Sequence, residues 1–244
     1  MPELFADDLP DTFDPELPNR KGARLDLLRR VFRYEVRGLE NVPTRGPALL
    51  VLNHGPLPVD AICLSRHLQV ETGRWPRFLG ERMIFENAAL SRYFGPWGVV
   101  EGNHYQARRR FEAGDLVAVF PGGAREAWKP FTQRRRVRWE GRSGFARLAF
   151  KSGVPIVPAA CPRAEDLYLM LNDGLAWGAR AFGASRNLPL PIWLGLGLLP
   201  VPFKLVHHIG APILPHPKRG ETADQTVERL RAETEAAMTE LLGR

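Results

Sequence analysis

The sequence predicts an α/β fold: a single domain with a mostly parallel or mixed sheet flanked by helices. Short apolar segments alternate with amphipathic ones along most of the chain, which is typical of a sheet covered by helices. Glycine and proline residues separate these segments. The length of 244 residues is enough for one domain whose core needs no disulfide and no structural metal.

The predicted elements are placed by hydrophobic periodicity and by residues that begin or end helices. One predicted helix, for example, has Ser143 before it as a cap and Gly153 after it as a stop. The predicted strands cover residues 48–52, 78–79, 97–100, 116–120, 154–160 and 204–210, and the predicted helices cover residues 60–68, 105–113, 144–151 and 222–242.

The beginning of the chain differs in composition from the rest. It is acidic and proline-rich, and it lacks the basic and apolar regions of a signal peptide. We therefore expect residues 1–20 to form a disordered acidic arm and residues 21–244 to form the domain. The longest uncharged apolar run, residues 188–203, is interrupted by prolines and is too short for a membrane-spanning helix.

A basic amphipathic helix is predicted at the start of the domain, within the arginine-rich residues 20–37. Leu25, Leu28 and Phe32 recur at helical spacing, with Leu27 and Val31 beside them. Two interpretations stay open. The helix lies on an anionic membrane surface, or it packs on the domain with its arginines facing water.

The charge and the cysteines limit the classes of partner. The net charge of +7 attracts anions such as nucleic acid, acidic phospholipid or a polyphosphate cofactor. The arginine clusters lack interleaved aromatic residues and any known nucleic-acid-binding module, so we expect no nucleic acid partner. Cys63 and Cys161 lie in apolar segments without metal-ligand spacing, so we expect buried free thiols and no metal.

A histidine and an aspartate flank a loop that follows the predicted strand 48–52. His54 leaves the strand next to Asn53, and Asp60 stands near the start of the following helix. Histidine suits proton transfer near neutral pH, and a carboxylate that accepts from Nδ1–H leaves Nε2 free as a base. The structural alternative is a capping aspartate and a half-buried histidine that do not interact.

A glycine-rich turn follows the predicted strand 116–120. Gly122 and Gly123 allow the backbone to approach a ligand closely, and their N–H groups suit an anion or an oxyanion. Arg125 adds a planar cationic group. The alternative is an ordinary turn with a surface arginine.

The remaining histidines have no partner at useful spacing, and we interpret them as structural: His67, His104, His207, His208 and His216. His104 is the one of interest, since it follows the segment around Gly80. A Gly-x-Ser-x-Gly segment is lacking, which argues against a serine hydrolase, and there is no phosphate-binding glycine motif or zinc signature.

Taken in order, these segments resemble the glycerolipid acyltransferase superfamily, which includes the 1-acylglycerol-3-phosphate acyltransferases. That family carries Asn-His-x4-Asp, then Phe-Pro-Glu-Gly-Thr-Arg, then a Val-Pro-x-x-Pro-like strand. The Pro-Gly-Gly-x-x-Glu-Ala form of the second motif is similar to the diacylglycerol-acyltransferase-like branch. The matching segments are Asn53-His54…Asp60, Gly80-Glu81-Arg82…Gly98, Phe120-Pro121-Gly122-Gly123-Ala124-Arg125-Glu126-Ala127, Arg142-Ser143-Gly144-Phe145-Ala146-Arg147 and Val154-Pro155-Ile156-Val157-Pro158.

The resemblance implies an acyltransferase domain over residues 21–244, with His54 as general base and Asp60 orienting it. It assigns substrate binding to Asn53, Gly122, Gly123, Arg125 and Glu126. It implies no cofactor, with acyl-CoA or an acyl carrier protein as co-substrate. The partners implied are the acyl donor, a lipid acceptor and the cytoplasmic face of a membrane, bound peripherally.

Two departures from the family motifs bear on the substrate. Five residues, not four, separate His54 from Asp60, and the family's glutamate and threonine are replaced by Gly122 and Ala124. The family uses that glutamate with the arginine to hold glycerol phosphate, so a neutral acceptor such as mono- or diacylglycerol is expected. Two alternatives remain: a lipid esterase or thioesterase with the same base acting on water, and a non-catalytic lipid-binding protein.

Overall fold

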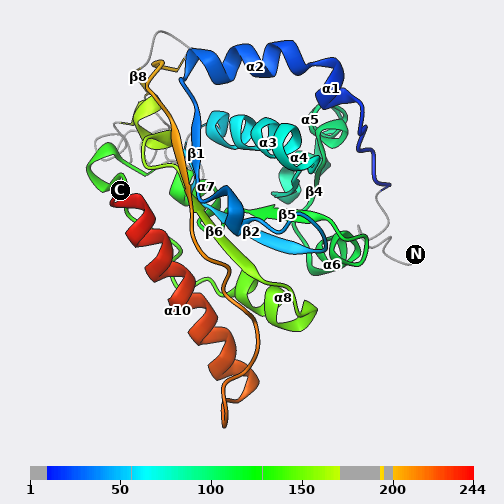
Figure 1. Cartoon of the computed structure of the whole chain (residues 1–244), viewed down its shortest axis with the longest axis vertical. Helices are drawn as coiled ribbons and strands as arrows, with labels where there is room; N and C mark the ends of the chain where they lie inside the picture. The colour runs from blue at the N-terminus through cyan, green and yellow to red at the C-terminus, as the bar shows by residue number, and fades with distance from the viewer. Residues whose placement is uncertain (1–9, 56, 128, 171–192, 195–199) are drawn as a thin grey trace, which may run out of the picture.

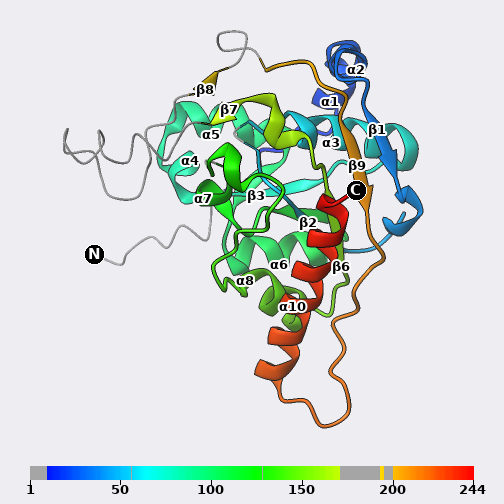
Figure 2. The ribbon, with the colours of Figure 1, turned by 90° about the vertical axis from the view of Figure 1, so that its left-hand side faces the viewer.

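The computed structural model describes residues 10–55, 57–127, 129–170, 193–194 and 200–244. A seven-stranded mixed sheet forms the centre of the domain, in the order β1-β9-β6-β2-β5-β3-β4 (Figures 1 and 2). Strands β6 and β9 pair antiparallel, and the other neighbouring strands pair parallel. The α/β fold with a mixed sheet flanked by helices is therefore confirmed.

The elements follow the predicted alternation closely. The sheet strands are β1 Glu35–Arg37, β2 Ala48–Leu52, β3 Arg77–Gly80, β4 Val99–Glu101, β5 Leu116–Val119, β6 Ile156–Ala160 and β9 Val206–Ile209, and a separate antiparallel pair joins β7 Leu169–Met170 to β8 Trp193–Leu194. The helices are α1 Leu17–Arg20, α2 Gly22–Val31, α3 Val59–Thr72, α4 Arg82–Glu86, α5 Ala88–Phe94, α6 His104–Glu112, α7 Gly123–Ala127, α8 Gly144–Ser152 and α10 Ala223–Leu242, with short 3-10 turns between some of them.

Strand β2 divides the core into two halves. All its residues are fully buried, as expected for a parallel strand covered on both faces. Leu50 and Leu52 belong to the core half that includes residues of α3, whereas Leu49 and Val51 belong to the half that includes residues of α6, α8 and α10. Figure 1 shows α2 and α3 on one side of the sheet and α8 and α10 on the other.

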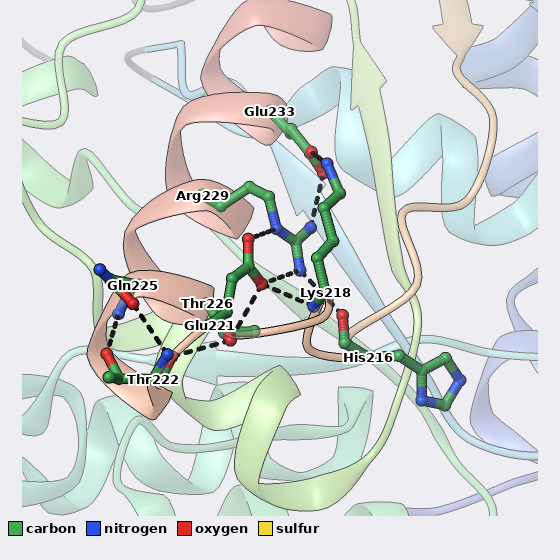
Figure 3. Close-up of polar contacts among 8 residues, drawn as sticks. All are labelled: His216, Lys218, Glu221, Thr222, Gln225, Thr226, Arg229 and Glu233. Atoms are coloured by element: carbon green, nitrogen blue, oxygen red, sulfur yellow. Dashed lines mark hydrogen bonds and ion pairs between the residues drawn. The ribbon is translucent and has the colours of Figure 1, made fainter.

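The last helix, α10, is fixed at its start by a polar network (Figure 3). Thr222 and Gln225 form a reciprocal capping box. Arg229 binds both Glu221, at 2.7 Å, and Glu233, at 3.1 Å. The Arg229 guanidinium lowers the pKa of Glu221 to about 2. These contacts orient the helix whose buried residues cover β6 and α8.

Helix α2 is the predicted basic amphipathic helix. Leu25 and Phe32 are buried, and Arg66 of α3 binds Asp26 at 2.8 Å, which attaches α2 to α3. The outer face nevertheless exposes two apolar side chains, with Leu27 59% and Val31 48% exposed. Packing on the domain therefore accounts for one face of the helix only.

For residues 10–20 the structure differs from the predicted disordered arm. Asp11 binds Arg77 at 2.5 Å and also pairs with Arg110. The Arg77 guanidinium lies 4.5 Å from the centre of the Phe13 ring. Both arginine side chains are at least 90% buried and therefore need acidic partners. Asp115 lies 3.6 and 3.7 Å from them, and Asp11 of the arm supplies the closer contacts, which sequence composition does not show.

Replacing this acidic partner should weaken the fold. We expect Asp11→Asn to lower the free energy of unfolding by about 1.5–3 kcal/mol, because two charge-assisted hydrogen bonds to buried arginines lose strength. Denaturant unfolding measures the change. Asp14→Asn is the matched control, since Asp14 pairs with Arg20 where both side chains are exposed. Equal effects of the two substitutions would show that the arm does not contribute through Asp11.

Candidate active site

The two motif loops meet at the carboxyl ends of β2 and β5. These strands pair in parallel, so the loops that follow them lie at the same edge of the sheet. The ring of His54 packs on the ring of Phe120, with 4.3 Å between centroids, and Phe78 stacks behind Phe120. The fold thus brings the histidine next to the start of the glycine-rich loop.

The hydrogen bond of His54 determines which ring nitrogen carries the proton. Its Nδ1 lies 2.6 Å from the carbonyl oxygen of Gly55. A carbonyl oxygen only accepts, so Nδ1 is the donor and Nε2 is left without a proton in the neutral ring. This is the tautomer that a general base needs.

The surroundings of His54 favour the neutral ring. Burial lowers the pKa of His54, although the residue remains partly exposed at the edge of the sheet. The Gly55 carbonyl and the Glu81 carboxylate act in the opposite direction, and the Lys129 ammonium adds to the lowering. The net effect is a pKa below the ordinary histidine value, so the ring is a free base at neutral pH.

Asp60 lies at the start of α3 and is 1% exposed. Among the described residues, no hydrogen bond joins it to His54, and its carboxylate oxygens lack a well-aligned partner, although the backbone N–H groups of Asp60 and Ala61 interact with them. Burial raises the pKa of Asp60 to about 7. The predicted pair is not closed in this conformation, so the orienting role of Asp60 stays a prediction.

The glycine-rich loop is shaped by a buried glutamate. A Cβ on Gly122 would lie 2.3 Å from both Cβ and Oε2 of Glu126, so a larger residue does not fit there. Gly123 has a φ of +54°, which favours glycine. The N–H of Ala124 donates to a carboxylate oxygen of Glu81 at 3.1 Å. This part of the loop therefore accommodates a negatively charged oxygen close to His54.

The two charged residues of the loop, Arg125 and Glu126, lie in different environments. Arg125 is exposed and pairs with Glu140. Glu126 is 1% exposed, and burial raises its pKa to about 7. A second arginine, Arg142, donates to the carbonyl oxygen of Gly122 at 3.0 Å and so attaches to the backbone of the loop.

Asn53 connects two strand ends. Its side chain accepts from the N–H of Cys161 at 2.8 Å and donates to the carbonyl oxygen of the same residue at 3.2 Å. Next to it lies a buried ion pair, Lys129 with Glu165 at 2.8 Å. Asn53 is 1% exposed, so this conformation uses it to join β2 to β6.

Sequence reasoning missed several of these residues. Lys129 and Glu165 lie far apart in the chain and match no motif, and Glu81 enters the sequence prediction only as part of a longer segment. His207 has no partner at short sequence spacing, but its Nε2 lies 3.6 Å from Asp60 and its Nδ1 lies 2.8 Å from the Tyr34 hydroxyl. No spacing rule predicts contacts between such distant positions.

Three buried groups in this region are close enough together to raise the question of a metal. Asp60, Cys161 and His207 offer atoms within 4.8 Å of one another. Burial raises the pKa of the Cys161 thiol well above its usual range, so the thiol is protonated in the metal-free protein. Among the described residues, the Tyr34 hydroxyl engages Nδ1 of His207 at 2.8 Å, whereas Nε2 of His207 and both oxygens of Asp60 lack a well-aligned hydrogen-bond partner.

Comparison with known proteins places these features in a family. A family model described as Acyltransferase matches residues 33–162, which include both motif loops. An uncharacterised protein of Mycobacterium tuberculosis is 37% identical over 188 residues, which cover 75% of this chain and 52% of that protein. A protein of Gallus gallus named DGAT1/2-independent enzyme synthesizing storage lipids is 30% identical over 216 residues, which cover 86% of this chain and 59% of that protein.

The chain spans little more than half the length of either relative. A similar fold occurs in the crystal structure of the 1-acyl-sn-glycerophosphate (LPA) acyltransferase PlsC from Thermotoga maritima. The two chains are 19% identical with a TM-score of 0.51, and the match covers 92% of this chain and 84% of that one. On the family model, which matches more than half of its length, the chain belongs to the Acyltransferase family.

Proposed function

We propose that this acyltransferase moves a fatty acyl group from a thioester to a hydroxyl group of a glycerolipid or another lipid alcohol, with His54 as general base. One observation carries the proposal: His54 is held with Nδ1 engaged and Nε2 free, beside a glycine-rich loop that accepts a negative oxygen. The acyl donor is acyl-CoA or an acylated carrier protein, both anionic, which suits the net charge of +7.

The proposed reaction needs only side chains and backbone groups of this chain. Nε2 of His54 takes the proton of the acceptor hydroxyl as its oxygen attacks the thioester carbonyl carbon. The carbonyl oxygen becomes an oxyanion, which the N–H of Ala124 stabilises once the Glu81 carboxylate gives way. The tetrahedral intermediate expels the thiolate, and the imidazolium returns a proton to it.

A neutral acceptor is the substrate class that the loop favours. Gly122 and Ala124 stand where the resembling family has a glutamate and a threonine, and Arg125 is occupied by Glu140. Fewer groups are therefore left to hold a phosphate. The name of the Gallus gallus relative refers to storage lipids, which agrees with a mono- or diacylglycerol acceptor.

We also propose that α2 binds the cytoplasmic face of a membrane peripherally. Its exposed Leu27 and Val31 lie on the outer face of a helix that also carries arginines. A pocket of about 430 Å³ at its end is lined by Asp26, Arg29, Arg30, Arg33, Tyr34 and Glu35. Over the described ranges, no helix has the length and hydrophobicity to cross a bilayer.

The substitution His54→Ala tests the chemistry. Loss of the base should lower kcat for acyl transfer by about 10²–10⁴-fold. The assay follows labelled acyl-CoA and acylated carrier protein with lysophosphatidic acid, monoacylglycerol, diacylglycerol and a long-chain alcohol. His216→Ala is the control, since His216 is exposed at the surface.

The products separate the proposal from its alternatives. An acylated lipid that disappears in His54→Ala supports the transferase. Release of free fatty acid alone would make the protein an esterase or thioesterase with the same base. No turnover with either donor would favour a lipid-binding protein without catalytic activity.

The pH dependence of the rate provides a second test. Because burial lowers the pKa of His54, the acidic limb of the kcat/KM profile should have its midpoint below the ordinary value of 6.5. The base is lost only when the ring gains a proton, so activity should persist to more acidic pH. Glu81 favours the protonated ring, and Glu81→Gln should therefore move the midpoint still lower. A midpoint above 6.5 would contradict the proposed environment.

Membrane binding is tested by the double substitution Leu27→Ser with Val31→Ser. Burial of these two side chains in a bilayer stabilises the bound state, so the affinity for vesicles should fall by at least about tenfold. Cosedimentation with phosphatidylcholine–phosphatidylglycerol vesicles measures this affinity. Leu214 is equally exposed, 59%, and Leu214→Ser is the matched control. An equal loss in both variants would argue against a specific role of α2.

A further inference from the structure

A buried polar cluster joins Asp60, at the start of α3, to His207 of β9 and Tyr34. Nε2 of His207 is 3.6 Å from Oδ2 of Asp60, and both side chains are at least 98% buried. Among the described residues, neither Nε2 nor either oxygen of Asp60 has a well-aligned hydrogen-bond partner, and the carboxylate interacts with the backbone N–H groups of Asp60 and Ala61. Buried polar groups are rarely left unpaired, so two such groups facing each other need an explanation.

The other nitrogen of His207 is already engaged. The hydroxyl of Tyr34 lies 2.8 Å from Nδ1. Burial raises the pKa of the Tyr34 phenol well above its usual value, so the hydroxyl keeps its proton and can donate it. When Tyr34 donates to Nδ1, the proton of the neutral imidazole is on Nε2, which faces Asp60.

The strands make this arrangement rigid. Tyr34 comes immediately before β1, and β1 pairs in parallel with β9, with Val36 opposite His207. Burial lowers the pKa of His207 to about 3, so its ring is neutral and acts as a directed donor. The separation of 3.6 Å is longer than a hydrogen bond, and a movement of less than about 1 Å closes it.

We propose that His207, oriented by Tyr34, is a positioning residue that holds one oxygen of Asp60 through Nε2–H. The other oxygen is then available to Nδ1–H of His54 when that ring leaves the Gly55 carbonyl. The inference rests on the proposed role of His54 as base. It adds two residues to the machinery that the family motifs do not contain. In this arrangement a residue of the distant strand β9, and not the motif loop, sets the direction of the Asp60 carboxylate.

Two conservative variants separate the two contacts of His207. In His207→Gln the side-chain amide nitrogen can reach the position of Nε2, whereas in His207→Asn it reaches only that of Nδ1. We expect His207→Asn to lower kcat by about 10–100-fold with little change in KM, as for residues that orient a catalytic group. His207→Gln should retain kcat within about threefold. Both variants should unfold at a temperature no lower than the Tm of the Asp60→Asn variant.

A double substitution shows whether His207 acts through Asp60. Asp60→Asn with His207→Asn should be no slower than Asp60→Asn alone. Additive losses would overturn the proposal, as would equal losses in His207→Gln and His207→Asn or unchanged kcat in both.

If no acyl transfer is found, the proposed function fails. The contacts of His207 can then still be tested by spectroscopy. Nitrogen-15 NMR of the imidazole groups should show His207 neutral with the proton on Nε2 between pH 6 and 8. Tyr34→Phe should abolish the preference for that tautomer. A proton on Nδ1 in the wild-type protein would overturn the proposal.

Discussion

The parallel pairing of β2 with β5 on one side and β6 on the other is the constraint on which the site depends. It places three loop starts at one edge of the sheet, so that His54, the glycine-rich turn after Phe120 and the segment after Cys161 become neighbours. Because β2 is fully buried on both faces, its register cannot shift without exposing core side chains. The position of the base is therefore determined by the hydrophobic core.

Burial at this edge also determines the protonation of the groups there. It lowers the pKa of His54 and raises those of Asp60 and Glu126 to about 7. Charges are costly in this region unless they are paired, as Lys129 and Glu165 are. A neutral imidazole that can accept a proton during the reaction, next to amides that can meet an oxyanion, is a consequence of this environment.

Much of the fold could be predicted from periodicity. Strand β2 has the predicted bounds, and α10 begins one residue after the predicted start and ends at the predicted residue. Helices α4 and α5 were missed because they are short and carry no clear apolar face. For residues 10–20 the structure differs from the predicted disordered arm, because composition shows the acidic residues but not the buried Arg77 that binds Asp11. The apolar run 188–203 lies largely outside the described residues.

The candidate site shows the same division between local and distant information. Motif spacing identified His54, Gly122 and Gly123, and the strand order brings their loops together. Motif spacing did not reveal that Nδ1 of His54 donates to the Gly55 carbonyl, and not to Asp60, in this conformation. It also did not reveal the pairing of His207 with Tyr34, since contacts between residues so distant in the chain depend on how β1 and β9 lie together.

The most direct test of the central claim is a crystal structure of the protein with a non-hydrolysable acyl-CoA analogue. The account predicts that the carbon corresponding to the thioester carbonyl lies next to His54, with room for the acceptor hydroxyl between this carbon and Nε2, and with its oxygen directed at the N–H of Ala124. Binding of that group elsewhere, for example in the arginine-lined pocket at the end of α2, with Nε2 of His54 out of reach, would contradict it.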